Sequence, residues 1–167
     1  SYTPYQAEIS QGRLEALFNY QTLVTELTGL PVSNASLLDE GTAAAEAMLL
    51  AHSTSNNNTF LVDQRVFSQT LKVLETRAEP LGIQIRLLDF NNPISLVKFE
   101  DAFGILIQMP NNEGEIINPD AIIRVATVHK CMKIAVVDPM AQVLMKPVGE
   151  MGFDIAVGSM QRFGIPM

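Results

Sequence analysis

The sequence predicts a three-layer α/β fold in which a mainly parallel β-sheet is covered by helices on both faces. Apolar segments with the length of strands alternate along the chain with segments of helical periodicity. Two strand segments, residues 102–109 and 133–137, are almost continuously apolar, as strands are when both faces of a parallel sheet are buried. The sequence shows no internal repeat and no linker, so we expect a single domain portion over residues 1–167.

The first half of the chain begins with a predicted helix whose apolar residues recur at helical spacing before Thr28-Gly29 and Pro31 stop it. A polar loop over residues 53–58 separates the helical start from the first alternation of strand and helix. The elements expected here, in order, are a helix over 13–28, a short strand around 32–36, a helix over 42–52, a strand over 59–62 ending at Asp63, a helix over 68–78 and an alternating strand over 83–88.

The second half of the chain continues the alternation. The strand over 102–109 is closed by Pro110, and Asn118-Pro119-Asp120 opens the next helix with a cap, a first-turn proline and an acid. Further strands are expected over 133–137 and 154–158. Neither a Gly-x-Gly-x-x-Gly turn nor a Gly-Lys-Ser/Thr phosphate loop is present, which argues against a dinucleotide-binding fold and a P-loop fold.

Composition and charge exclude several classes of protein. The 11 basic residues are scattered among 18 acidic ones, so no cationic stripe could neutralise a nucleic-acid backbone. No apolar run approaches the roughly 20 residues that span a bilayer, so no membrane segment is expected. The single cysteine, Cys131, cannot form an internal disulfide and fits a reducing compartment. Because the chain begins at Ser1 without a methionine, we interpret it as an excised fragment.

Three segments together resemble a known family. They are Thr3-Pro-Tyr-Gln-Ala-Glu-Ile-Ser-Gln-Gly12, the run from Asn34 to Ala47, and Asp154-Ile-Ala-Val-Gly-Ser159 with Met160-Gln-Arg-Phe-Gly164 after it. Over essentially the whole chain the sequence closely resembles the amino-terminal half of glycine decarboxylases, the pyridoxal-phosphate P-proteins of the glycine cleavage system. The resemblance implies an incomplete large domain of the aspartate-aminotransferase-like, fold type I pyridoxal-phosphate family.

The resemblance also implies what the parent enzyme does. Such an enzyme condenses glycine with pyridoxal phosphate, releases carbon dioxide and passes the aminomethyl group to a lipoyl carrier protein, with the protonated pyridine ring stabilising the carbanion. Its partners would be a catalytic half, on the same or a separate chain, and the lipoyl carrier. It would be cytoplasmic in a bacterium or lie in the mitochondrial matrix of a eukaryote. Exposed edges and apolar patches on one portion of a sheet further predict an oligomer.

Arg162 stands where the resemblance places the Schiff-base lysine. In the catalytic half of the family a His-Lys pair follows the matching strand, whereas this chain has Gln161-Arg162. A Schiff base requires an amine that can lose its proton, and a guanidinium stays protonated. We therefore expect no covalent cofactor here, and we favour a salt bridge or an interface contact for Arg162. None of the chain's lysines follows a strand at the expected ligand edge: Lys72, Lys98, Lys130, Lys133 and Lys146.

Candidate cofactor contacts are Gly41, Thr42 and Asp138. Gly41 and Thr42 open a helix where such folds cradle the cofactor phosphate, but Asp39 and Glu40 already place two carboxylates there, so an acid-capped helix start is the alternative. Asp138 ends an apolar strand, where relatives pair an aspartate with the pyridine nitrogen. Asp138-Pro139 is equally an ordinary helix cap with proline in the first helical position.

The amino-terminal segment offers candidates for contact with glycine or with the other half of the enzyme. Tyr2, Tyr5 and Gln6 carry hydrogen-bonding groups on an extended, proline-set stretch, although simple packing of the terminus is the alternative. Arg162 joins them as a candidate inter-half contact. His52 and His129 have no second histidine or cysteine at ligand spacing, so we expect no metal site.

Three functional hypotheses remain from the sequence. The chain is part of an active glycine decarboxylase and supplies a wall of its site, or it is a degenerate duplicate that serves only as scaffold and interaction surface. The acidic helix start and Gln161-Arg162 favour the second for this chain taken alone. An unrelated aminotransferase-like enzyme would need a lysine after the strand over 154–158, which the sequence lacks.

Overall fold

The computed structural model describes residues 12–34, 36–92 and 99–164. Its strands form one sheet in the order β2-β1-β3-β4-β5, and every neighbouring pair is parallel. The strands are β1 (Thr59–Asp63), β2 (Gln84–Leu88), β3 (Ala102–Met109), β4 (Met132–Val137) and β5 (Ile155–Val157). The helices are α1 (Arg13–Thr28), α2 (Glu40–Ser53), α3 (Ser68–Ala78), α4 (Asp120–Val128) and α5 (Pro139–Gln142), with the 3-10 turns η2 (Glu79–Leu81) and η4 (Met160–Phe163).

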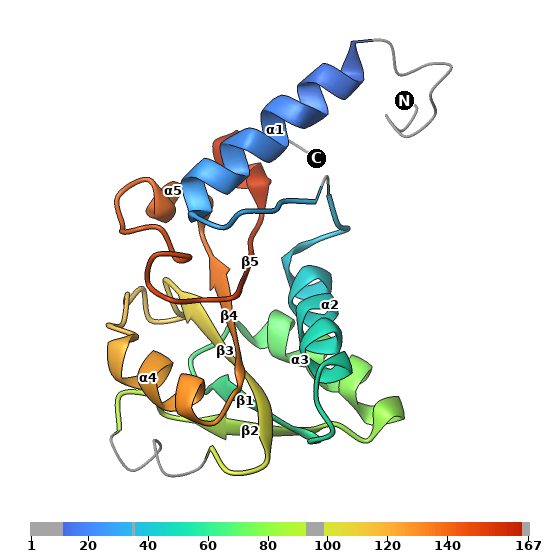
Figure 1. Ribbon diagram of the computed structural model, residues 1–167, viewed down its shortest axis with the longest axis vertical. Coiled ribbons are helices and arrows are strands. Elements are labelled where there is room, and N and C mark those ends of the chain that lie inside the picture. The colour runs from blue at the N-terminus through green and yellow to red at the C-terminus, as the bar shows by residue number, and fades with distance from the viewer. Residues whose placement is uncertain (1–11, 35, 93–98, 165–167) are drawn as a thin grey trace.

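Helices cover both faces of the sheet, so the predicted three-layer arrangement is confirmed (Figure 1). Side chains alternate along each strand, so that Phe60 and Val62 of β1 pack toward α2 and α3 while Leu61 packs toward α4. All eight residues of β3 are buried because β3 is central and lies under both layers.

The first helix, α1, reaches away from the sheet and contacts the body through its carboxyl end (Figure 1). There the Gly149 N–H donates to the Thr28 carbonyl at 2.8 Å. A Cβ at Gly149 would overlap the backbone of Gly29, so this junction requires glycine. Among the described residues of α1, only Thr28 is fully buried.

The short strand expected around residues 32–36 is wrong. Residues 32–34 and 36 form no strand, and the Ser33 carbonyl instead accepts a hydrogen bond from the Gln21 side chain at 2.8 Å. Val32 and Leu38 remain more than four-fifths exposed, so an extended local pattern here has no neighbouring strand to pair with and no core to enter.

The other expected elements are confirmed to within about two residues, as is usual for element boundaries. α2 begins at Glu40 rather than Thr42. α4 begins at Asp120, so Pro119 is its N-cap and not the predicted first-turn proline, and Asn118 Oδ1 accepts the Asp120 N–H at 3.0 Å. The turns η2 and η4 were not expected. Within the described residues, no helix is long and apolar enough to span a membrane.

Candidate functional site

Polar side chains gather where the parallel strands end. Because β1, β3, β4 and β5 run the same way, Asp63 at the end of β1 lies at the same edge of the sheet as the residues that follow the other strands: Pro110, Asp138 and Ser159. This carboxyl edge is where open α/β sheets bind ligands. Two clusters lie there, a cavity between α2 and η4 and a polar network around Arg65.

The cavity has a volume of about 300 Å³. Its walls come from the start of α2, the loop before α3, the end of β3 and the segments after β4 and β5. The residues that line it are Glu40, Phe67, Gln108, Pro110, Asp138, Ser159 and Arg162. Two of the predicted site residues, Asp138 and Arg162, therefore share one cavity, whereas Gly41 and Thr42 do not line it.

Asp138 and Arg162 form an ion pair across this cavity. Arg162 Nε donates to Asp138 Oδ2 at 2.8 Å, while Asp138 Oδ1 accepts the Met140 N–H at 2.9 Å and caps α5. The predicted cap with Pro139 in the first helical position is thus confirmed, and so is the salt bridge favoured for Arg162. Both carboxylate oxygens of Asp138 are engaged by the chain's own donors.

A glycine brings the two partners together. Gly158, directly after β5, lies so close to β4 that a Cβ on it would overlap the carbonyl oxygen of Val137. This close approach sets Ser159 and η4 against the beginning of α5. The pairing of Asp138 with Arg162 therefore follows from backbone packing at the end of the sheet.

Glu40 enters the cavity from the first turn of α2. Gln108, buried at the end of β3, donates to Glu40 Oε1 at 3.0 Å and accepts the Phe67 N–H at 2.9 Å. Burial raises the pKa of Glu40, the Gln108 hydrogen bond opposes the rise, and the nearby charges of Asp138 and Asp39 add to it. The cavity thus holds a carboxyl group that is more easily protonated than an exposed glutamate.

The amino-terminal end of α2 is capped by the acidic residue that precedes it. Asp39 Oδ1 accepts the Thr42 N–H at 2.7 Å, and this bond lowers the pKa of Asp39. The predicted acid-capped helix start is confirmed. Gly41 faces α3, where a Cβ would stand 3.3 Å from Val73 Cγ2, so its missing side chain serves helix packing.

The residues of this cavity do not fit pyridoxal phosphate. Its lining contains no lysine, and the guanidinium in the equivalent place is paired with Asp138. Asp39 takes an N–H that a phosphate would need, and Glu40 sets a second acid beside it. The chemistry of the donor set therefore opposes both the aldehyde and the phosphate of the cofactor.

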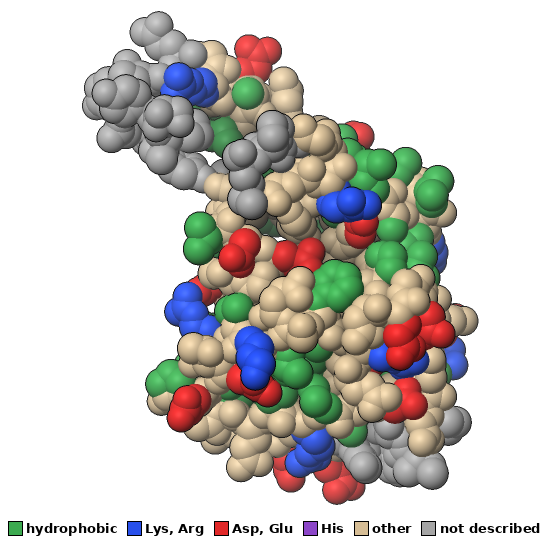
Figure 2. Space-filling model, turned by 180° about the vertical axis from the view of Figure 1, so that it is seen from behind, with side chains coloured by type: hydrophobic (Ala, Val, Ile, Leu, Met, Phe, Trp, Pro, Cys, Tyr) green, Lys and Arg blue, Asp and Glu red, His purple; other side chains and the backbone are tan. Residues whose placement is uncertain are grey.

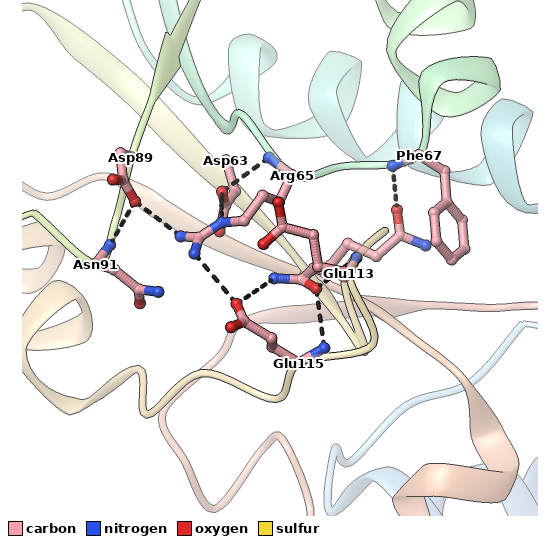
Figure 3. A network of polar contacts seen from close by, with 9 residues as sticks. Asp63, Arg65, Phe67, Asp89, Asn91, Glu113 and Glu115 are labelled. Carbon is pink, nitrogen blue, oxygen red and sulfur yellow. Dashed lines mark hydrogen bonds and ion pairs between the residues drawn. The ribbon is translucent and has the colours of Figure 1, made fainter.

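Arg65 is the centre of the second cluster, which sequence reasoning missed (Figure 3). Its guanidinium contacts Asp63 at 3.3 Å, Asp89 at 2.9 Å and Glu115 at 3.3 Å, so that it joins three loops at the carboxyl edge. Asp63 is 1% exposed, and its Oδ2 atom has no hydrogen-bond partner. The sequence does place an acid at the end of each of two consecutive strands, Asp63 and Asp89, with Arg65 close to the first. This pattern could have predicted the cluster.

The remaining candidates are placed as follows. Tyr2, Tyr5 and Gln6 lie outside the described residues. His52 Nε2 lies 3.0 Å from Asn58 Oδ1, and His129 packs beside the ring of Phe99.

Cys131 is buried, as expected for a small apolar residue, and burial raises its pKa to about 11. In the ranges that the structure covers, no three His, Cys, Asp or Glu side chains are arranged to hold a metal ion.

Comparison with known sequences gives a consistent family. Residues 1–167 match the family described as "Glycine cleavage system P-protein". The chain is 60% identical to a glycine dehydrogenase (decarboxylating) of Prochlorococcus marinus strain NATL2A and 52% identical to one of Rhodopseudomonas palustris. Each alignment covers all of this chain but 17% of the relative, so the chain spans about one-sixth of their length.

Solved structures agree with the sequences. A crystal structure of glycine decarboxylase (P-protein) of the glycine cleavage system superposes with a TM-score of 0.90 at 38% identity, covering 100% of this chain and 39% of that one. The cystathionine γ-lyase CalE6 of Micromonospora echinospora, covered over 43% of its length, shows the same fold at a TM-score of 0.72 and 17% identity over 96% of this chain. The predicted likeness to fold type I pyridoxal-phosphate enzymes is confirmed. The chain belongs to the glycine cleavage system P-protein family.

Proposed function

We propose that this chain is part of a pyridoxal-phosphate-dependent glycine decarboxylase and that it does not itself carry the cofactor. The parent enzyme decarboxylates glycine and transfers the aminomethyl group to a lipoyl carrier protein. The observation that carries the proposal is the ion pair of Arg162 with Asp138 in a cavity that contains no lysine. The Schiff-base lysine and the cofactor then belong to a catalytic half, on the same or a separate chain.

The contribution of this chain is support and a wall for that half. Family membership and the bacterial relatives support the parent activity and a cytoplasmic location. Both carboxylate oxygens of Asp138 accept hydrogen bonds from the chain itself, and Asp39 caps the start of α2. Both observations support a site that has lost cofactor binding. The alternative is that this chain is a scaffold with no contact to glycine or cofactor. The same ion pair favours this alternative if the amino-terminal segment does not reach the substrate.

Reduction of the cofactor onto its lysine tests the proposal. The full-length enzyme is incubated with pyridoxal phosphate, its aldimine band near ~410–430 nm is recorded, and borohydride then fixes the cofactor for peptide mapping. We expect the label outside residues 1–167, and the same yield in Arg162→Gln as in the unchanged enzyme. A label on any lysine of this chain would overturn the proposal.

The variant Arg162→Lys sharpens this test because it restores an amine at the equivalent position. We expect no second labelled site in that variant, since Asp39 and Glu40 still oppose a phosphate. Tyr5→Phe separates the two roles of this chain. A lower kcat/KM for glycine supports a wall of the active site, and unchanged kinetics support the scaffold.

A further inference from the structure

The cavity between α2 and η4 contains one acid that no cation neutralises. Of its three charged residues, Asp138 and Arg162 pair with each other at 2.8 Å. Glu40 forms no ion pair within the described part of the chain, and its hydrogen-bond partner there, Gln108, is a neutral amide. By contrast, the three acids of the Arg65 cluster share one guanidinium. The cavity therefore carries one excess negative charge when its acids are ionised.

The Glu40 carboxyl group is held in place from one side only. The amide oxygen of Gln108 accepts the Phe67 N–H at 2.9 Å, so its Nε2 atom is the one that donates to Glu40 Oε1 at 3.0 Å. The second oxygen, Oε2, has no hydrogen-bond partner among the described residues. Burial disfavours the ionised carboxylate, and a positively charged donor beside Oε2 would offset that cost.

The rest of the lining suits an organic cation better than a metal ion or an anion. Phe67 and Pro110 make much of it apolar, and an aromatic ring attracts an ammonium group. Ser159 adds a hydroxyl that can accept a hydrogen bond. No three His, Cys, Asp or Glu side chains of the described residues are arranged to share a metal ion, and the acids near Glu40 oppose an anion. The volume of about 300 Å³ equals that of about ten liquid water molecules, which leaves room for a small molecule.

The charge of the whole chain also favours a cationic ligand. Its 18 acidic and 11 basic residues give a net charge of −7. Seen from behind, the basic side chains lie scattered among acidic ones (Figure 2). A field of this sign raises the local concentration of small cations and lowers that of anions.

We propose that this cavity binds a small aliphatic primary ammonium, with Glu40 as its counter-ion and the Ser159 hydroxyl as a second acceptor. Simple alkylamines and free amino acids both carry this group. In an amino acid the carboxylate would lie toward the terminal nitrogens of Arg162, which have no hydrogen-bond partner among the described residues. The site goes beyond the proposed function and does not depend on it, because its residues all belong to this chain.

Calorimetric titration with propylamine tests this site. The full-length enzyme is first reduced with borohydride, so that its cofactor is fixed on a lysine and cannot condense with an amine. We expect saturable binding that becomes about tenfold weaker or more in Glu40→Gln, which keeps an acceptor for Gln108 but removes the negative charge. Propan-1-ol, a neutral ligand of the same shape, should bind more weakly than propylamine to the unchanged enzyme.

Glu46→Gln is the matched control, because it removes a carboxylate from the same helix outside the cavity and should leave the affinity unchanged. Equal affinity in Glu40→Gln and the unchanged enzyme, equal affinity for propylamine and propan-1-ol, or no saturable binding of propylamine would each overturn the inference. 3-Aminopropanoate distinguishes the two sources of the ammonium group. Tighter binding than propylamine assigns the site to an amino acid, and weaker binding assigns it to a simple amine.

The position of the borohydride label tests the proposed function separately. A label outside residues 1–167 together with no propylamine site removes only the ammonium site. A label on a lysine of this chain removes the proposed function, whatever the titration shows.

Discussion

Glu40 is a single carboxyl group in the cavity that contributes to the pH dependence of stability. Its folded pKa is raised, first by burial, so the folded chain holds this proton more tightly than the unfolded chain does. Protonation therefore favours folding, and this contribution is lost as the pH rises from about 4.5, the ordinary value, through the raised folded pKa. We predict that Glu40→Gln, which keeps an acceptor for Gln108, becomes progressively more stable than the unchanged chain as the pH rises above 4.5.

Urea unfolding at several pH values between 4 and 8 measures this difference in the free energy of unfolding. Glu46→Gln is the matched control, because Glu46 lies on the same helix but is half exposed and pairs with Arg77 at the surface. If the Glu40→Gln and unchanged chains keep a constant difference over the whole pH range, burial does not act on Glu40 as inferred.

The sequence predicts the site only where the contacts join residues that are close together in the chain. The caps by Asp39 and Asp138 were readable because each acid stands directly before a helix. A salt bridge for Arg162 was expected, but its partner lies 24 residues away, and only the approach at Gly158 brings the two together. The place of Glu40 beside Gln108, 68 positions apart, likewise depends on packing that no local pattern encodes.

At the scale of elements, Arg65 ties the loops after β1, β2 and β3 into one edge (Figure 3). Its side chain is 10% exposed and that of Asp63 is 1% exposed. Removing a partner from a buried ion pair leaves an uncompensated charge and costs about 3–5 kcal/mol. We predict a loss of this size in the free energy of unfolding for Arg65→Met, measured by urea denaturation.

Two comparisons make the Arg65 prediction specific. Arg77→Met breaks the half-exposed pair with Glu46 and should cost about 0–1 kcal/mol, since surface pairs contribute little. Arg65→Met combined with Asp63→Asn should recover part of the loss, because the buried charge is then removed as well. A cost for Arg65→Met no larger than that of Arg77→Met would show that the three loops hold their places without it.

The helices and strands were predictable where the surrounding sheet and helices favour the same structure as the local sequence does. The apolar runs of β3 and β4 read as strands and are strands, because each is buried between two partners and two helical layers. The segment around residues 32–36 is mostly polar and has no neighbouring strand, and its described residues do not form one. Strand formation depends on pairing and burial as much as on composition, and those are properties of the whole sheet.

At the scale of the whole molecule, exposed apolar side chains concentrate toward the end that carries α1, α5 and η4. Leu14, Phe18 and Leu23 of α1 are each at least half exposed, and so are Val143 and Leu144, which follow α5. Exposed apolar side chains that are grouped in this way favour contact with another chain. In a solution of this chain alone, other copies of the chain are the partners available to cover these side chains.

We therefore predict that the purified chain self-associates, with an average mass that rises with concentration in sedimentation-equilibrium runs. Leu144→Asp should shift the chain toward the monomer because it places a charge in the apolar contact, whereas Val128→Asp at the other edge of the sheet should leave the association unchanged. A monodisperse monomer at high concentration would mean that the exposed apolar side chains do not suffice for association.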